Sequence, residues 1–238
     1  MTRTTQHWLC IGLIVCAGAL AYSTSFEGTY VDIDDFGSIR DNWHIELSRT
    51  DGVAPGSSWF VAAGIRVWRA MSLPPFDLGL GATAAGRPLL GLSLAINRSV
   101  CGHAPWGYHL GNLLIHLGAA LLLFGIIRRT LARPEYEETF RRTGEWIAFA
   151  CALLWCVHPL NTQAVTYLCQ RAESQMGFFY FLTLYSAIRG FDAGDRGRWG
   201  WYAATIVASF LGMCTKQVMV SAPIIVYLYD SIFVSRSY

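Results

Sequence analysis

The stretch that decides the fold class is WGYHLGNLLIHLGAALLLFGII, residues 106–127. It contains no Asp, Glu, Lys or Arg, and its second half is continuously apolar. A helix needs about 20 consecutive, mostly apolar residues to cross the hydrocarbon core of a bilayer. The stretch therefore predicts a transmembrane α-helix and indicates an integral membrane protein.

The composition of the whole chain supports this class. Of its 238 residues 53% are hydrophobic and 14% charged, whereas a soluble domain carries roughly a quarter charged residues. The net charge of +2 is too small to indicate a nucleic-acid partner. Most cysteines lie in apolar runs and none has a metal-binding spacing such as CxxC, so we expect neither a disulfide framework nor a metal site.

Further apolar runs predict an all-α, polytopic transmembrane bundle of about six spans. These runs are residues 8–22, 146–157, 176–188, 199–214 and 218–233. The first has the short apolar core of a signal peptide, but no good cleavage site follows it. We therefore interpret it as an uncleaved first transmembrane helix.

Basic residues gather in the short loops between these runs. They are Arg128, Arg129, Arg133, Arg141 and Arg142 in one loop and Arg189, Arg196 and Arg198 in another, with Arg3 before the first run and Arg236 after the last. Basic residues in short loops mark the cytoplasmic side. The alternation predicts a cytoplasmic N-terminus and a long first loop, about residues 23–105, on the outer or luminal face.

This outer loop contains two stretches with helical character. Residues 57–71 carry Trp, Phe, Val and Ile with two arginines at helical spacing, which is typical of an amphipathic helix at the membrane interface. Packing against protein is an equally good interpretation of this pattern. Pro74-Pro75 is expected to end the helix. Residues 87–97 are too short for a span and predict a buried or half-inserted helix.

The outer loop also holds the acidic stretch VDIDDFGSI, residues 31–39. In an extended segment Asp34 and Asp35 point to opposite faces, so one could address a reacting group while the other holds the backbone or a second ligand. Alternatively, one of them is the N-cap of a short helix that begins near Phe36. The motif alone leaves both interpretations open.

Three polar residues share one face of the 106–127 helix. His109 and Asn112 are spaced i, i+3, and Asn112 and His116 are spaced i, i+4. Polar groups within a span usually form hydrogen bonds between helices. No further ligands at matching spacing accompany the histidines. We therefore favour helix–helix contacts over a metal site.

More ionisable residues fall at the outer ends of the predicted spans. The turn HPLNTQ at residues 158–163, Arg171 and Lys216 all lie on the predicted outer face. An ionisable residue at a membrane boundary is a candidate functional residue. Two cations opposite a carboxylate pair suit a lipid phosphate, with a carboxylate as general base for an acceptor hydroxyl. The alternative is a set of structural salt bridges between loops.

Taken in order, these motifs resemble the GT-C glycosyltransferases, and more closely the transmembrane proteins with C-terminal tetratricopeptide repeats that include O-mannosyltransferases and bacterial relatives. The resemblance covers almost the whole chain from Ser23 on. It rests on Asp34-Asp35, Arg87-Pro88-Leu89, GYHLGNLLIH at residues 107–116, HPLNTQAV at residues 158–165, Arg171-Ala172-Glu173 and Thr215-Lys216-Gln217.

The resemblance implies an enzyme that moves a sugar from a polyprenyl-phosphate donor to an acceptor hydroxyl of a protein or glycan on the outer or luminal face. The lipid-linked sugar is a substrate, and neither a cofactor nor a metal is implied. By analogy Asp34 is the base, Asp35 positions the acceptor, and Arg171 and Lys216 bind the donor phosphate. The implied pocket-shaping residues are His158, Gln163, Gln217, Arg87 and His109.

The chain departs from the family pattern in two ways. Gln163 and Gln217 stand where the family usually has Glu, and Gln keeps the shape but not the charge. GT-C enzymes usually carry more spans, and no repeat of about 34 residues follows here. We therefore expect residues 1–238 to form one incomplete GT-C-like domain, the N-terminal portion of a longer protein or a truncated product.

Two other classes of function remain. A non-catalytic membrane scaffold is consistent with an incomplete site. A transporter subunit is less well supported, because transporters place charges near mid-membrane or show duplicated halves with broken helices, and neither is visible here.

Overall fold

The computed structural model describes residues 2–30, 35–72 and 86–235, apart from the side chains of Glu137 and Arg196. Within these ranges all regular structure is helical, which confirms the all-α prediction. Asp34 and the Pro74-Pro75 pair lie outside the described residues.

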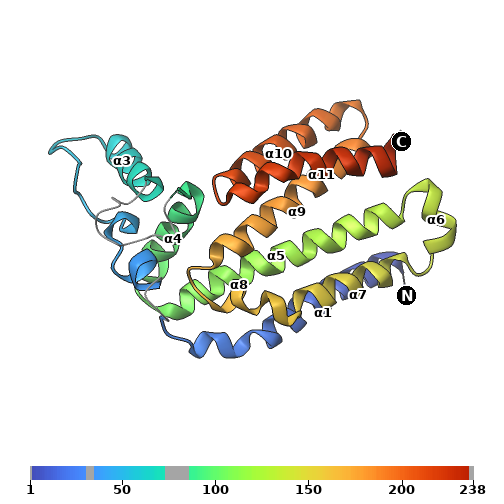
Figure 1. Ribbon diagram of the computed structural model, residues 1–238, viewed down its shortest axis with the longest axis horizontal. Helices are drawn as coiled ribbons and strands as arrows, with labels where there is room; N and C mark the ends of the chain where they lie inside the picture. Colours follow the sequence, from blue (N-terminus) through green and yellow to red (C-terminus); the bar gives the residue numbers. More distant parts are fainter. Residues whose placement is uncertain (1, 31–34, 73–85, 236–238) are drawn as a thin grey trace.

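Six rods of helix form an elongated bundle, and each contains one of the predicted apolar runs (Figure 1). They are α1 (Arg3–Ala21), α5 (Pro105–Leu131), α7 (Gly144–Cys156), α9 (Arg171–Asp192), α10 (Asp195–Met213) and a last rod of η6 (Gln217–Ser221), α11 (Ala222–Tyr229) and η7 (Asp230–Val234). α9 packs on both α5 and α10, and α1 packs on α5 and α7.

The bundle has two ends of different character. The arginine end holds the N-terminus, the short helix α6 (Pro134–Phe140), the α9–α10 connection and the end of the last rod (Figure 1). The loop end holds η5 (Pro159–Asn161), α8 (Thr162–Thr166), the α10–η6 turn and the long first loop (Figure 1). The predicted alternation of loops is therefore present, while the side of a membrane that each end faces stays a prediction.

Not all six rods are apolar enough to qualify as spans on their own. Among the described residues, three helices are long and apolar enough to cross a membrane, Arg3–Ala21, Pro105–Leu131 and Gln217–Val234. A fourth is possible if Gly144–Cys156 and Pro159–Thr166, bent by 49°, count as one broken span. α9 and α10 are long enough but begin with polar, charged turns, so the number of six spans stays a prediction.

Three glycines of α5, spaced seven residues apart, form a glycine heptad pattern at the contact with α9. A Cβ atom on Gly111 would lie 2.8 Å from the Arg171 guanidinium, one on Gly118 2.9 Å from the Phe178 ring, and one on Gly125 2.8 Å from the Tyr185 ring. Glycines and partners both recur every seven residues, the period at which two helices keep one face in contact. Small residues let backbones approach closely without a hydrophobic driving force.

The other side of α5 packs on α1 and α7 through small and polar residues. Ile14, Ala120, Ala148 and Ala152 form a buried cluster there. The Nε2 atom of His116 lies 2.8 Å from the Cys156 carbonyl oxygen at the end of α7. The contact confirms the helix–helix role predicted for His116.

The first loop folds into two helices, as the sequence predicts. α3 (Trp59–Met71) begins at Ser58, whose side chain accepts a hydrogen bond from the Val61 amide, and its face with Trp59, Phe60 and Trp68 is exposed. That face is compatible with the interface interpretation of the 57–71 pattern. α4 (Pro88–Cys101) buries Leu90 and Leu94, which confirms a buried helix there.

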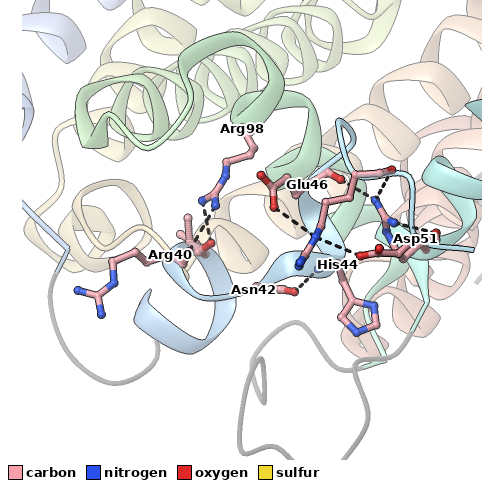
Figure 2. A network of polar contacts seen from close by, with 9 residues as sticks. Arg40, Asn42, His44, Glu46, Asp51 and Arg98 are labelled. Atoms are coloured by element: carbon pink, nitrogen blue, oxygen red, sulfur yellow. Dashed lines mark hydrogen bonds and ion pairs between the residues drawn. The ribbon is translucent and has the colours of Figure 1, made fainter.

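Two buried arginines order the rest of the loop by donating to its backbone carbonyls. The Arg98 Nη1 atom donates to the Ile39 carbonyl at 3.1 Å (Figure 2). The Arg69 guanidinium donates to the Glu46 carbonyl at 2.6 Å and the Asp51 carbonyl at 3.2 Å. Buried backbone carbonyls need hydrogen-bond partners, so these arginines stabilise a segment that has little regular structure.

Candidate functional site

A polar cavity of about 530 Å³ lies at the loop end, where α5, α8 and α9 meet. Its polar lining consists of His116, Asn161, Gln163, Gln170, Glu173 and Ser174. Concave sites with a few convergent polar groups are the usual form of small-molecule sites. Three of the sequence motifs, at residues 107–116, 158–165 and 171–173, contribute lining residues, so we take this cavity as the candidate site.

Asp35 anchors the acidic stretch to the turn that precedes α9. Its carboxylate is fully buried, and Oδ1 accepts a hydrogen bond from the Cys169 amide at 2.9 Å. A short helix, η2 (Phe36–Arg40), does begin directly after Asp35, as one interpretation predicted, but the Asp35 side chain makes no cap hydrogen bond to it. The carboxylate instead joins the first loop to the α8–α9 connection, beside the cavity residue Gln170.

Arg171, the first residue of α9, follows the same turn and is buried. Its side chain is only 2% exposed. It donates to Asn112 Oδ1 at 2.6 Å, Asn97 Oδ1 at 2.7 Å and the Tyr108 carbonyl at 2.9 Å. Asn112 in turn donates to the Val165 carbonyl at 3.2 Å. The predicted helix–helix role of Asn112 is thus confirmed, with Arg171 at the centre of the network.

Lys216 lies on the turn between α10 and η6 and forms an ion pair with Glu173 of the cavity wall. The same turn is tied to α4, because the Leu89 amide donates to the Cys214 carbonyl at 3.1 Å. Arg171 and Lys216 were expected to act together on a donor phosphate. In the structure the Arg171 guanidinium packs against α4 and α5, whereas Lys216 stands at the cavity wall.

The remaining predicted residues are spread around this end of the bundle. Gln163 is exposed and lines the cavity, and Gln217 is exposed next to Lys216. His158 is exposed and accepts a hydrogen bond from the Leu160 amide at 3.2 Å. Arg87 directly precedes α4, and buried His109 packs against Gly28.

Glu173 and Gln170 line the cavity, and no role was predicted for either from the sequence. Glu173 stands inside the Arg171-Ala172-Glu173 motif, but a carboxylate in the first turn of a helix is common and does not indicate a cavity. Their role depends on the α8–α9 turn, which no local pattern describes. In the described ranges no group of three or more His, Cys, Asp or Glu side chains could hold a metal ion.

The fold and this cavity define a class: an all-helical membrane protein with a polar cavity at the end of its bundle, bordered by one ion-paired lysine. No family model matches the chain. No solved structure matches it either.

Comparison with known proteins gives a more specific relationship. The chain is 28% identical over 84% of its length to the protein O-mannosyl-transferase Tmtc2 of Drosophila melanogaster. It is 27% identical over 87% of its length to human TMTC1, and 29% identical over 63% to mouse TMTC2, both named protein O-mannosyl-transferases. The chain is thus a distant homologue of their N-terminal membrane region. It spans about a fifth of the length of these relatives, 20%, 21% and 17% respectively.

Proposed function

We propose that the protein containing this chain is a membrane glycosyltransferase that moves a sugar from a polyprenyl-phosphate donor to a protein hydroxyl. The observation that carries the proposal is the homology, which extends over 84% of the chain to a protein O-mannosyl-transferase. The polar cavity at the loop end supports it, because the matching motifs supply much of its wall. On this proposal the loop end faces the outer or luminal side.

The proposed step is a single displacement at the anomeric carbon. The acceptor oxygen bonds to that carbon while the bond from carbon to phosphate oxygen breaks, and the leaving phosphate keeps the electron pair. The acceptor proton passes to the Asp34 carboxylate, acting as general base. A phosphate monoester is a stable anion, so the step itself does not demand a metal.

The described contacts support different roles for the two neighbouring carboxylates. Asp35 is fully buried and bonded to the Cys169 amide, so it suits a positioning role. Asp34, one residue earlier, is left as the proposed base. Lys216 is the proposed phosphate-binding cation, since its side chain is 26% exposed beside the cavity wall, whereas Arg171 is buried.

The test is transfer of labelled sugar by the purified whole protein in liposomes, with polyprenyl-phosphate mannose and an acceptor peptide. Asp34→Asn should reduce the rate by about 10²–10⁴-fold, the contribution of a general base. Asn caps a helix as well as Asp does, so a pure capping role predicts almost no change. Asp35→Asn serves as the matched control, because Asn Oδ1 can still accept from the Cys169 amide.

Loss in Asp35→Asn with retention in Asp34→Asn would move the base by one residue. Full activity in both single variants and in the double variant would contradict the catalytic role of this stretch. A non-catalytic scaffold is the second candidate, favoured by the buried hydrogen bonds that Asp35 and Arg171 form with other parts of the chain. It predicts no transfer by the unmodified protein with any lipid-linked hexose.

A further inference from the structure

A second cavity, of about 680 Å³, lies at the arginine end, at the opposite end of the bundle from the candidate site. It is formed by α1, α5, the end of α6 and the start of α7. Its charged lining consists of Arg3, Arg128, Arg141, Arg142, His7 and Glu145. The proposed transfer reaction uses none of these residues.

Among the described lining residues, positive charge exceeds negative charge. Glu145 is the one acidic residue in this described lining, and its Oε1 atom lies 2.9 Å from His7 Nδ1. None of the four lining arginines forms an ion pair or a side-chain hydrogen bond with any residue that the structure describes. The buried Nε atom of Arg128 and Nε2 atom of Gln6 also lack acceptors among the described residues.

Other arginines at the same end form ion pairs with an acidic residue of the protein. Arg129 and Arg133 both form ion pairs with Asp192 at the end of α9, at 3.2 and 3.5 Å. The preference of basic residues for cytoplasmic loops explains why arginines are numerous at this end. It does not explain why four unpaired ones surround a cavity. Arg3, Arg141 and Arg142 are exposed and Arg128 is half-buried. An anion inside the cavity would replace water at the exposed guanidinium groups and supply an acceptor to the buried Arg128 Nε atom.

The cavity lies at the ends of two candidate membrane spans. α1 and α5 are two of the helices long and apolar enough to span a membrane, and the cavity is at their arginine ends. Trp8 on α1 is 66% exposed and Trp146 on α7 is 42% exposed, each next to a cavity-lining residue. Exposed tryptophans near the ends of spans are typical of the headgroup region.

We propose that this cavity binds the phosphate headgroup of an anionic phospholipid from the surrounding leaflet. Four arginines and one carboxylate leave about three positive charges, more than the single charge of a phosphodiester neutralises. A phosphate monoester carries about 1.5 to 2 negative charges at neutral pH and presents three acceptor oxygens. Arginine binds such groups with two parallel hydrogen bonds. A monoester headgroup, as in phosphatidic acid, therefore fits best.

The experiment measures binding of dioctanoyl phosphatidic acid to the purified whole protein in neutral detergent, with dioctanoyl phosphatidylcholine and inorganic phosphate as parallel ligands. Binding of phosphatidic acid should be saturable, and Arg128→Gln with Arg142→Gln should weaken it by about 100-fold, roughly tenfold for each lost charge-assisted hydrogen bond. Arg198→Gln is the matched control, because Arg198 lies at the same end but pairs with Asp195. It should leave the affinity unchanged.

Three results would overturn the proposal. Equal weakening in Arg198→Gln would show that only net charge matters. Inorganic phosphate binding as tightly as the lipid would identify a soluble phosphate as the ligand. Unchanged affinity in the double variant would remove the cavity from the interaction. If the double variant does not fold, Arg128→Lys with Arg142→Lys replaces it, and binding should then weaken while the melting temperature is kept.

Discussion

The two ends of the bundle use the same kind of residue in opposite ways. At the loop end, Arg69, Arg98 and Arg171 are buried and donate to carbonyl and amide oxygens. At the arginine end, four arginines surround a cavity without a protein partner among the described residues. A buried cation that donates several hydrogen bonds to the protein stabilises the fold, whereas one without a protein partner is available to a ligand.

The number of charged residues at one end of the bundle therefore does not assign a role to any of them. Arg171 and Lys216 stand at the same end and were expected to share one phosphate. Only Lys216 is near the cavity wall and partly exposed, while Arg171 bonds α4 and α5 to α9. Burial and partners, not residue type, separate the structural cation from the candidate binding one.

The largest effect is expected for Arg171→Met. The substitution removes the donor from two buried acceptors, on Tyr108 and Asn112, and from a partly buried acceptor on Asn97. Each unsatisfied buried group costs about 1–3 kcal/mol, and broken buried networks cost roughly 3–5 kcal/mol in total. Thermal unfolding of the detergent-solubilised protein should show this loss, while Arg142→Met at the arginine end stays within about 0.5 kcal/mol of the unmodified chain. Equal stability of the two variants would contradict the structural role of Arg171 and its contrast with Arg142.

The next effect concerns Lys216. In the proposed enzyme Lys216→Met should raise the KM for the lipid-phosphate donor by about tenfold or more, since a charge-assisted hydrogen bond contributes roughly 1.5–3 kcal/mol. Glu173→Gln releases Lys216 from its ion pair and should keep donor use or improve it. Equal losses in the two variants would mean that the pair is structural.

A smaller effect is expected for Gly118→Ala in the α5–α9 heptad. The added Cβ atom would lie 2.9 Å from the Phe178 ring, so the ring must move, at a cost of about 1 kcal/mol. Gly12→Ala in α1 is the matched control, because a Cβ atom there meets nothing within 4 Å. Its melting temperature should be unchanged or slightly higher, since Ala favours helix over Gly. A lower melting temperature for Gly12→Ala than for Gly118→Ala would refute the heptad packing.

Periodicity and charge placement predicted much of the fold. The apolar runs gave all six rods, and the 57–71 and 87–97 patterns gave α3 and α4, because these signals are local. The glycine heptad at residues 111, 118 and 125 is visible in the sequence, but its partners on α9 lie about 60 residues away and no local rule pairs them. The site was predicted in outline only, because the hydrogen bond from the Cys169 amide to Asp35 joins residues that are 134 positions apart in the sequence.

On the proposed topology, the candidate site and the arginine cavity face opposite sides of a membrane. This topology is tested by labelling Leu160→Cys and Asp195→Cys in intact cells or sealed vesicles with a membrane-impermeant thiol reagent, with the unmodified chain as background. Leu160 is 84% exposed at the loop end, and the Asp195 side chain is 96% exposed at the arginine end. We predict that Leu160→Cys is labelled from the outer or luminal side. Asp195→Cys should be labelled only after permeabilisation. Labelling of Asp195→Cys from the outer side without permeabilisation would contradict this topology.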